Sequence, residues 1–189
     1  MFLNAEILIQ AYLSGAFPMA HPEQDNAIYW HTPAIRGIIP LDDKFTVPKN
    51  LGRLYRSGKF EFSINRCFEQ VIQECALQRA DDTWISEEIE DAYTNLHLMG
   101  YAHSFETWYH GELVGGLYGV AIGKAFFGES MFFKMNDASK LALLFLVDYL
   151  REHDFNLLDS QYLNPHLLQF GAFEIDHEEY LARLQDAVS

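Results

Sequence analysis

The order of apolar segments between residues 101 and 163 constrains the fold more than any other feature of the sequence. Three stretches with strand-like patterns, "YAHSFETWYH", "LVGGLYGVAIG" and "KAFFGESMFF", are joined by glycine-containing turns and predict an antiparallel meander. Residues 138–152 come next and are apolar on nearly every side, so a helix there has to be buried. "FNLLDSQYL" at 155–163 then predicts a further strand. This order predicts an α+β domain.

The same order of elements occurs in the N-acetyltransferase-like (GNAT-like) acyltransferase fold, although a fold alone does not specify chemistry. Members that use coenzyme A carry a glycine-rich turn before the central helix, where backbone N–H groups bind the pyrophosphate. The corresponding residues here read "FFKMNDASK" and contain no glycine. If the chain has this fold, its donor is therefore not expected to be an acyl-coenzyme A, and we expect no cofactor.

The first third of the chain predicts a smaller unit in front of this domain. We expect a small N-terminal domain over residues 1–40 and an acyltransferase-like catalytic domain over residues 41–189, with a basic helix near its start. The remaining predicted elements are a helix from Asn4 to Gly15, a loop over 17–26, extended chain over 27–40, a helix opened by Pro48, a strand over 59–64, and helices over 65–79, from Ser86 to Gly100 and over 177–187.

The charge distribution leaves two interpretations open. A net charge of −14 argues against nucleic-acid binding by the chain as a whole. Seven of the 13 basic residues, however, lie between Arg36 and Arg66, and Lys49, Arg53 and Arg56 share one face of the predicted basic helix. That face is either an ordinary solvated surface or a local anion-binding patch.

Compartment and metal content are predicted from what the sequence lacks. No apolar run approaches the ~20 residues that span a bilayer, and the N-terminus lacks a basic start and a cleavage site. Cys67 and Cys75 match no metal-binding spacing and are expected to be reduced thiols. We therefore expect a cytoplasmic protein with no metal, no membrane partner and no covalent nucleophile.

Polar residues inside two predicted strands are the candidate site. On a strand, Asp159 and Gln161 project to the same face, where the carboxylate can accept from the carboxamide NH₂ and leave the amide oxygen free for an incoming amine. The alternative is a structural polar network. Glu129 lies in the apolar stretch "GESMFF" and needs either a basic core partner or a cationic ligand. Asn164 before Pro165 is most simply a turn residue.

Several blocks of this sequence resemble the leucyl/phenylalanyl-tRNA–protein transferases of bacteria. The blocks are "ELVGGLYGVAIGKAFFGESMFF", "NDASKLAL", "LLDSQYLNPHLLQFGAFEI", "GYAHSFETW", "AYLSGAFPM" and "YWHTPAIRGIIP", and together they cover nearly the whole chain. The resemblance implies transfer of Leu, Phe and, weakly, Met from aminoacyl-tRNA to the α-amine of proteins with N-terminal Arg or Lys. The product is then read by the N-end-rule degradation machinery.

The resemblance also implies roles for particular residues. Asp159 and Gln161 occupy the catalytic positions, and Glu129 and Asn164 lie on the side of the acceptor. An apolar pocket for the aminoacyl side chain is implied for Trp84, Phe126, Met131 and Leu146, and tRNA binding for Lys49, Arg53 and Arg56. The family usually begins some thirty residues earlier, and Met19 and Ala20 replace an aromatic pair; both departures bear on docking and substrate range.

An aminoacyl ester is already activated, so the expected catalysis is positioning of the amine, with Gln161 accepting a hydrogen bond from it. Two rival functions remain: an acyl-coenzyme A-dependent N-acetyltransferase, and a non-catalytic module that binds basic protein N-termini.

Overall fold

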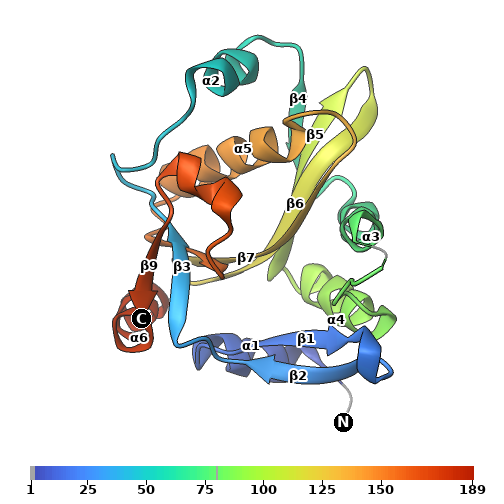
Figure 1. Ribbon diagram of the computed structural model, residues 1–189, viewed down its shortest axis with the longest axis vertical. Helices are drawn as coiled ribbons and strands as arrows, with labels where there is room; N and C mark the ends of the chain where they lie inside the picture. Colours follow the sequence, from blue (N-terminus) through green and yellow to red (C-terminus); the bar gives the residue numbers. More distant parts are fainter. Residues whose placement is uncertain (1–2, 80) are drawn as a thin grey trace.

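A seven-stranded sheet runs through the middle of the computed structural model, which describes residues 3–79 and 81–189 (Figure 1). All neighbouring strands are antiparallel except β7 and β8, which are parallel. The strands in spatial order are β4 (Glu61–Ile64), β5 (Ala102–Tyr109), β6 (Glu112–Ile122), β7 (Ala125–Phe133), β8 (Leu157–Gln161), β3 (Ile35–Ile39) and β9 (Phe173–Asp176).

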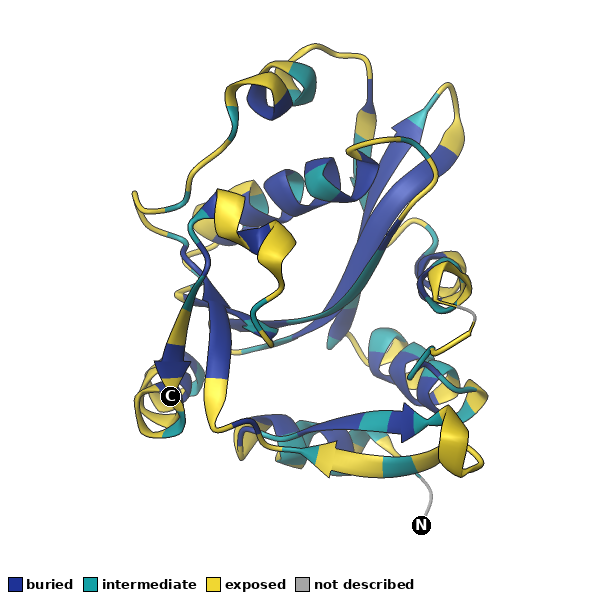
Figure 2. Ribbon diagram, in the orientation of Figure 1, coloured by how far each residue is buried: buried dark blue, intermediate teal, exposed yellow. Residues whose placement is uncertain are grey.

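Helices cover both faces of this sheet and divide the apolar interior into two clusters. One face carries α5 (Ala138–Glu152), with α2 (Lys49–Arg56) packed against it. The other face carries α1 (Ala5–Leu13), α3 (Phe68–Gln78), α4 (Glu87–Leu98) and α6 (His177–Val188). Figure 2 shows α5 buried along most of its length, as its sequence predicts.

The connection from β7 through α5 to β8 confirms the predicted acyltransferase-like order. Two parallel neighbouring strands need a long crossover, and α5 supplies it while covering the meander β5–β6–β7. The Thr107 hydroxyl of β5 donates to the carbonyl of Ala138 at 2.8 Å, which attaches the start of α5 to the sheet. The predicted α+β class and the GNAT-like arrangement are therefore confirmed.

The prediction of a loop over residues 17–26 is wrong for residues 17–21. These residues form β1 (Phe17–His21), which pairs with β2 (Ala27–His31) as a separate two-stranded sheet. A short 3₁₀ turn, η1 (Pro22–Gln24), joins them. Asp25 and Asn26 both adopt positive φ angles, which these residue types tolerate best among non-glycines. Only residues 22–26 of the predicted loop lie outside the two strands.

Two further differences from the sequence predictions concern the strands after β7 in the sheet order. The strand predicted over 155–163 is shorter, since β8 ends at Gln161, and the 3₁₀ helix η2 (Pro165–Phe170) and β9 were not predicted. β3 belongs to the expected 1–40 unit, yet it lies between β8 and β9 in the large sheet. The helix starts predicted at Asn4 and Ser86 are confirmed, and each of these side chains caps its helix by accepting from the backbone N–H three residues on.

Within residues 3–79 and 81–189, none of the helices has the length and apolar character needed to cross a bilayer.

Candidate active site

Two β-bulges lie side by side where β7 and β8 separate. Their parallel pairing ends at Phe127 and Asp159. Immediately beyond it, Glu129 is an extra residue in β7 relative to β6, and Ser160 is an extra residue in β8 relative to β3. Bulges redirect side chains and are frequent beside functional sites. Here they bring Glu129 and Gln161 together, with Gln161 Nε2 donating to Glu129 Oε1 at 3.0 Å.

The bulge in β8 depends on a glycine in the neighbouring strand. A Cβ atom on Gly37 of β3 would lie 2.7 Å from both Ser160 Oγ and the backbone nitrogen of Leu163. Any side chain at this position would therefore push the bulged segment away, so Gly37 permits the close approach of the two backbones.

Asp159 is fully buried, and its carboxylate accepts hydrogen bonds from Arg36, from Tyr180 and from the backbone of Gln161. Arg36 Nε lies 3.1 Å from Oδ1 and Arg36 Nη2 lies 2.8 Å from Oδ2, the Tyr180 hydroxyl donates to Oδ2 at 2.6 Å, and the backbone N–H of Gln161 donates to Oδ1 at 2.7 Å. Arg36 is 1% exposed and also donates to the carbonyl of Gly15 at 2.7 Å. A carboxylate with this many donors orients other groups and has little capacity left for a substrate.

The charge pair is held together by its surroundings. Burial by itself lowers the pKa of the Arg36 guanidinium, but the adjacent Asp159 carboxylate more than offsets this, so the pKa is raised above its usual value. The guanidinium also lies over the rings of Phe17 and Tyr180, at 5.0 and 4.1 Å from their centroids. The ion pair of Arg36 and Asp159 links β3 to β8, and the contacts of both residues with Tyr180 extend the link to α6.

The predicted contact between the Asp159 and Gln161 side chains is wrong. Asp159 accepts from the backbone N–H of Gln161, while the Gln161 carboxamide turns to Glu129. The reason is the bulge, together with the φ angle of 67° at Gln161, which removes the simple alternation of a regular strand. Asp159 thus orients Gln161 through the main chain.

Glu129 has one satisfied and one unsatisfied carboxyl oxygen. Its Oε1 accepts from Gln161 Nε2 and from the Tyr12 hydroxyl, which in turn is hydrogen-bonded to the Tyr93 hydroxyl. Its Oε2 is buried without a hydrogen-bond partner in the described part of the chain, and the basic core partner considered from the sequence is not found there. Burial raises the pKa of Glu129 to about 8, against the lowering effect of Tyr12 and Gln161.

Residues beside the site become partly exposed where β7 and β8 separate. Gly128, Ser130 and Met131 are partly exposed and follow Phe127, the last residue of β7 that pairs with β8. A Cβ atom on Gly128 would meet only the carbonyl oxygen of Asp159, at 3.4 Å. Gln161 is 7% exposed, and for its Oε1 no donor is found among the described residues. The arrangement offers an acceptor atom on Gln161 beside an unpaired carboxyl oxygen on Glu129.

The four residues expected to form the aminoacyl pocket do not lie in one place. Phe126, Met131 and Leu146 belong to the apolar cluster on the α5 face, and Phe126 and Leu146 are each 1% exposed. Trp84 packs in the cluster on the opposite face, where its carbonyl accepts from the backbone N–H of Ala20 at 3.2 Å. Entry of an aminoacyl side chain beside Phe126 and Leu146 requires the core to open.

Asn164 and the basic helix lie outside this network. Asn164 is exposed and caps η2, its side chain accepting from the backbone N–H of His166 at 3.0 Å, as a turn residue does. The predicted helix α2 is present, and Lys49, Arg53 and Arg56 are all exposed on it; we call these three residues the basic face of α2.

Arg36, Tyr180, Tyr12 and Tyr93 are members of the site that the sequence analysis did not select as candidates. They lie 123, 21, 117 and 81 residues from the residues that they bond in the network. A tyrosine on an amphipathic helix looks like an ordinary core residue, so no local signal identified these side chains.

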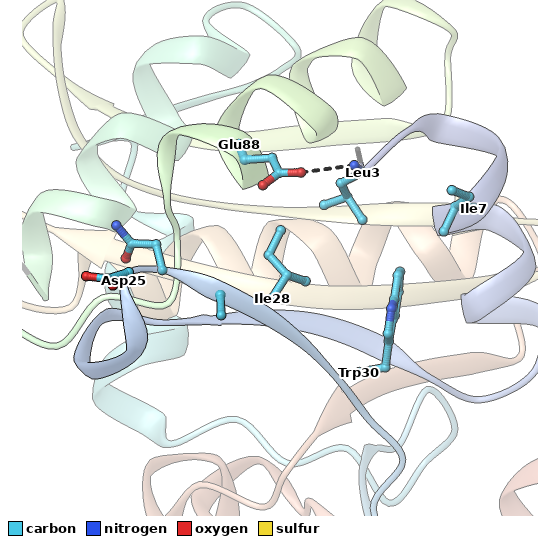
Figure 3. A pocket seen from close by; sticks show the side chains of 8 residues that line it. Leu3, Ile7, Asp25, Ile28, Trp30 and Glu88 are labelled. Atoms are coloured by element: carbon cyan, nitrogen blue, oxygen red, sulfur yellow. Dashed lines mark hydrogen bonds between the residues drawn. The ribbon is translucent and has the colours of Figure 1, made fainter. Parts of the chain in front are cut away.

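A surface hollow of about 400 Å³ lies elsewhere, between the start of α1, β2 and the start of α4 (Figure 3). Glu88 accepts there from the backbone N–H of Leu3 at 3.0 Å, and Trp30 and Ile28 form its β2 side. None of the network residues lines this hollow. Within the described ranges, no group of three or more His, Cys, Asp or Glu side chains could hold a metal ion.

Comparison with known families agrees with these observations. Residues 38–185 match the model of the leucyl/phenylalanyl-tRNA protein transferase family, and residues 1–34 match the model of that family's N-terminal domain. A leucyl/phenylalanyl-tRNA–protein transferase of Chlorobaculum parvum is 49% identical over 189 residues, which are 99% of this chain and 96% of that protein. The relative from Paramagnetospirillum magneticum is also 49% identical, over 99% of this chain and 90% of its own length.

Among solved structures, FemX has a TM-score of 0.60 at 11% identity, covering 76% of this chain and 60% of its own. At that identity the likeness concerns the fold alone. The matches to these two relatives cover 96% and 90% of the relatives' own lengths. The family therefore includes members of about this size, whereas the sequence analysis expected family members to begin some thirty residues earlier. On the two family matches and these relatives, the chain belongs to the leucyl/phenylalanyl-tRNA–protein transferase family.

Proposed function

We propose that this protein transfers Leu, Phe and, weakly, Met from aminoacyl-tRNA to the α-amine of proteins that begin with Arg or Lys, which marks them for N-end-rule degradation. The names of its relatives support the reaction class. The single structural observation that supports a cationic acceptor is the buried, unpaired Oε2 atom of Glu129.

The protonation of Glu129 couples the acceptor to the site. With a pKa of about 8, the empty site holds a mostly neutral carboxyl near pH 7. An arginine or lysine side chain beside Oε2 favours the carboxylate, so binding of the cation releases a proton from Glu129. An acceptor with a neutral first residue gains nothing from that ionisation. This difference supports selection of N-terminal Arg or Lys over, for example, Ala.

Gln161 is the residue that we assign to the reacting amine. Its Oε1 accepts a hydrogen bond from the neutral α-amine, whose lone pair attacks the ester carbonyl carbon. A C–N bond forms, the C–O bond to the ribose breaks, and the ribose oxygen leaves with the electron pair and takes the proton that the amine nitrogen loses. Positioning of this kind supplies ~7–11 kcal/mol in well-oriented reactions. No strong base is required, because the ester is already activated.

Asp159 acts behind Gln161 as a positioning residue. It holds the backbone of Gln161 through a 2.7 Å hydrogen bond and is itself held by Arg36 and Tyr180. We assign the basic face of α2 to the tRNA, because phosphates bind to exposed cations on an otherwise acidic protein. Phe126, Met131 and Leu146, which share the α5 face, stay the proposed aminoacyl pocket, and it needs the core to open; Trp84 lies on the other face of the sheet and is left out of it.

A transfer assay tests the proposal with purified Leu-tRNA and peptides that begin with Arg, Lys or Ala. We expect transfer to the Arg and Lys peptides and little to the Ala peptide. Gln161→Ala should lower kcat about 10²-fold or more, a loss typical of a removed positioning or transition-state contact. Gln78→Ala, which removes a surface glutamine that bonds only the backbone of Phe133, is the matched control.

Two further arms address the rival functions. Acetyl transfer from acetyl-coenzyme A to the same peptides, with none from Leu-tRNA, would establish the N-acetyltransferase instead. Saturable binding of Arg peptides without turnover of any donor would establish a non-catalytic module. Equal transfer to Arg and Ala peptides would contradict the role given to Glu129.

A further inference from the structure

The side chains of His21, at the end of β1, and His31, at the end of β2, meet through their imidazole rings. The Nε2 atoms of His21 and His31 are 3.3 Å apart, and their rings are parallel to within 5°. The other nitrogen of each ring also has a partner: His21 Nδ1 lies 2.9 Å from Glu23 Oε1, and His31 Nδ1 lies 3.4 Å from the hydroxyl of Tyr162. The four side chains form one hydrogen-bonded series, which we call the histidine relay.

Only one proton fits between the two Nε2 atoms. Glu23 accepts from His21 Nδ1–H, so a neutral His21 presents a lone pair at Nε2. His31 then donates from Nε2–H, and its Nδ1 accepts from the hydroxyl of Tyr162. One added proton can be shared by a change of tautomer. A second proton puts two N–H groups and two positive charges face to face, and the contact breaks.

The relay ends one residue from the proposed catalytic glutamine. Gln161 has a φ angle of 67°, a left-handed conformation that costs a non-glycine residue roughly 1–2 kcal/mol. Such a conformation persists only when its neighbours hold it. Asp159 holds the N–H of Gln161 from one side. On the other side, Tyr162 is held by His31 and by an edge contact with Phe17, with ring centroids 5.8 Å apart.

The charged and titratable groups around His31 come from three places. His21 faces it from β1, with Glu23 behind His21, and Tyr162 faces it from the segment after β8. Phe17 stacks on the ring of His31, with centroids 5.8 Å apart, and Arg36 lies on Phe17.

We propose that His31 is a positioning residue that holds Tyr162, and through it the strained Gln161, and that this hold is lost when both imidazoles of the histidine relay are protonated. The inference rests on the proposed function for its effect on transfer, but its geometry stands without that function. Desolvation and the neighbouring His21 lower the pKa of His31, as expected for the ring that accepts its proton last. The hold is therefore lost as the pH falls through the lowered pKa of His31, on the acid side of the ordinary histidine value of 6.5.

The test has a spectroscopic arm that needs no substrate. In NMR titrations of the histidine C–H signals of the folded protein, the signals of His31 should move in two steps, because a proton added to either ring is felt at the other. In His21→Gln, the pKa of His31 should rise toward its ordinary value. Independent titration of the two rings, with His31 unchanged in His21→Gln, overturns the proposal whatever the enzyme does.

The kinetic arm compares pH profiles of transfer. His31→Phe keeps an aromatic ring between Phe17 and His21 but removes both nitrogens. The ratio of kcat/KM of the wild type to that of His31→Phe should fall about fivefold between pH 7.5 and 5.5, as expected for one repulsive pair of like charges. Tyr162→Phe lacks the hydroxyl that His31 bonds, so the ratio of kcat/KM of the wild type to that of Tyr162→Phe should fall in the same way between pH 7.5 and 5.5.

His166→Gln, an exposed histidine outside the relay, is the control and should leave the ratio constant with pH. A constant ratio for both His31→Phe and Tyr162→Phe refutes the positioning role. Failure of the proposed function itself would appear differently, as absence of transfer in every variant at every pH, with the NMR result then deciding the relay alone.

Discussion

Replacing Glu129 by glutamine should change how the stability of the protein depends on pH. In the folded protein the pKa of Glu129 is raised to about 8, while in the unfolded chain it has its ordinary value of 4.5. Between these two values the unfolded state has lost a proton that the folded state keeps. The free energy of unfolding therefore falls as the pH rises through this interval, by up to ~1.4 kcal/mol per pH unit.

The magnitude follows from the width of the interval. From pH 5.5 to 7.5 the wild type should lose roughly 2–3 kcal/mol relative to Glu129→Gln, because the amide cannot ionise. The carboxamide keeps the oxygen that accepts from Tyr12 and Gln161. Its NH₂ group takes the place of the unpaired Oε2, at a cost of roughly 1–3 kcal/mol that does not depend on pH. The prediction is therefore a changing difference between the two proteins.

Urea unfolding of both proteins at pH 5.5, 6.5, 7.5 and 8.5 measures this difference. Glu112→Gln, at an exposed position at the start of β6, controls for the loss of one carboxylate from a chain of net charge −14. A difference between wild type and Glu129→Gln that stays constant from pH 5.5 to 8.5 would refute the idea that the buried carboxyl is held neutral.

Three other outcomes follow from the same contacts. Asp159→Asn leaves a buried guanidinium without its counter-charge and should destabilise the protein by about 3–5 kcal/mol in chemical unfolding. Tyr12→Phe removes a hydrogen bond that lowers the pKa of Glu129, so this pKa should rise. The pH at which KM for an Arg peptide changes, measured between pH 6 and 9, should therefore move to a higher value. Reversing the three charges of the basic face of α2 to Glu should raise KM for the tRNA, leave KM for the peptide unchanged and weaken the salt dependence of the tRNA KM by a slope of about two to three. Equal effects of the reversal on both substrates would contradict a tRNA-specific surface.

The long elements were predictable because their signals are local. The meander, the buried helix α5 and the capped helices α1 and α4 each repeat a periodic pattern over eight or more residues, and all are present. The short elements were not predictable in the same way. β1 and β9 have five and four residues, and each is a strand only because another segment of the chain lies beside it.

The candidate site shows the same division at the level of side chains. Asp159, Gln161 and Glu129 stand out in the sequence because polar residues in apolar strands need partners. Their actual partners could not be read from it, since Arg36 and Tyr12 lie 123 and 117 residues away from the atoms they bond.

The sequence by itself determined the α+β class, the order of the central elements, the polar residues of the site and the family resemblance, since all of these depend on composition and pattern over short stretches. Only the tertiary structure decided that Asp159 is enclosed by Arg36 and Tyr180, that Gln161 turns to Glu129, and that Trp84 lies on the other face of the sheet from Phe126. The physical reason is that a bulge of one residue changes where a strand points its side chains, and the strand pairings that create the two bulges join residues far apart in the chain.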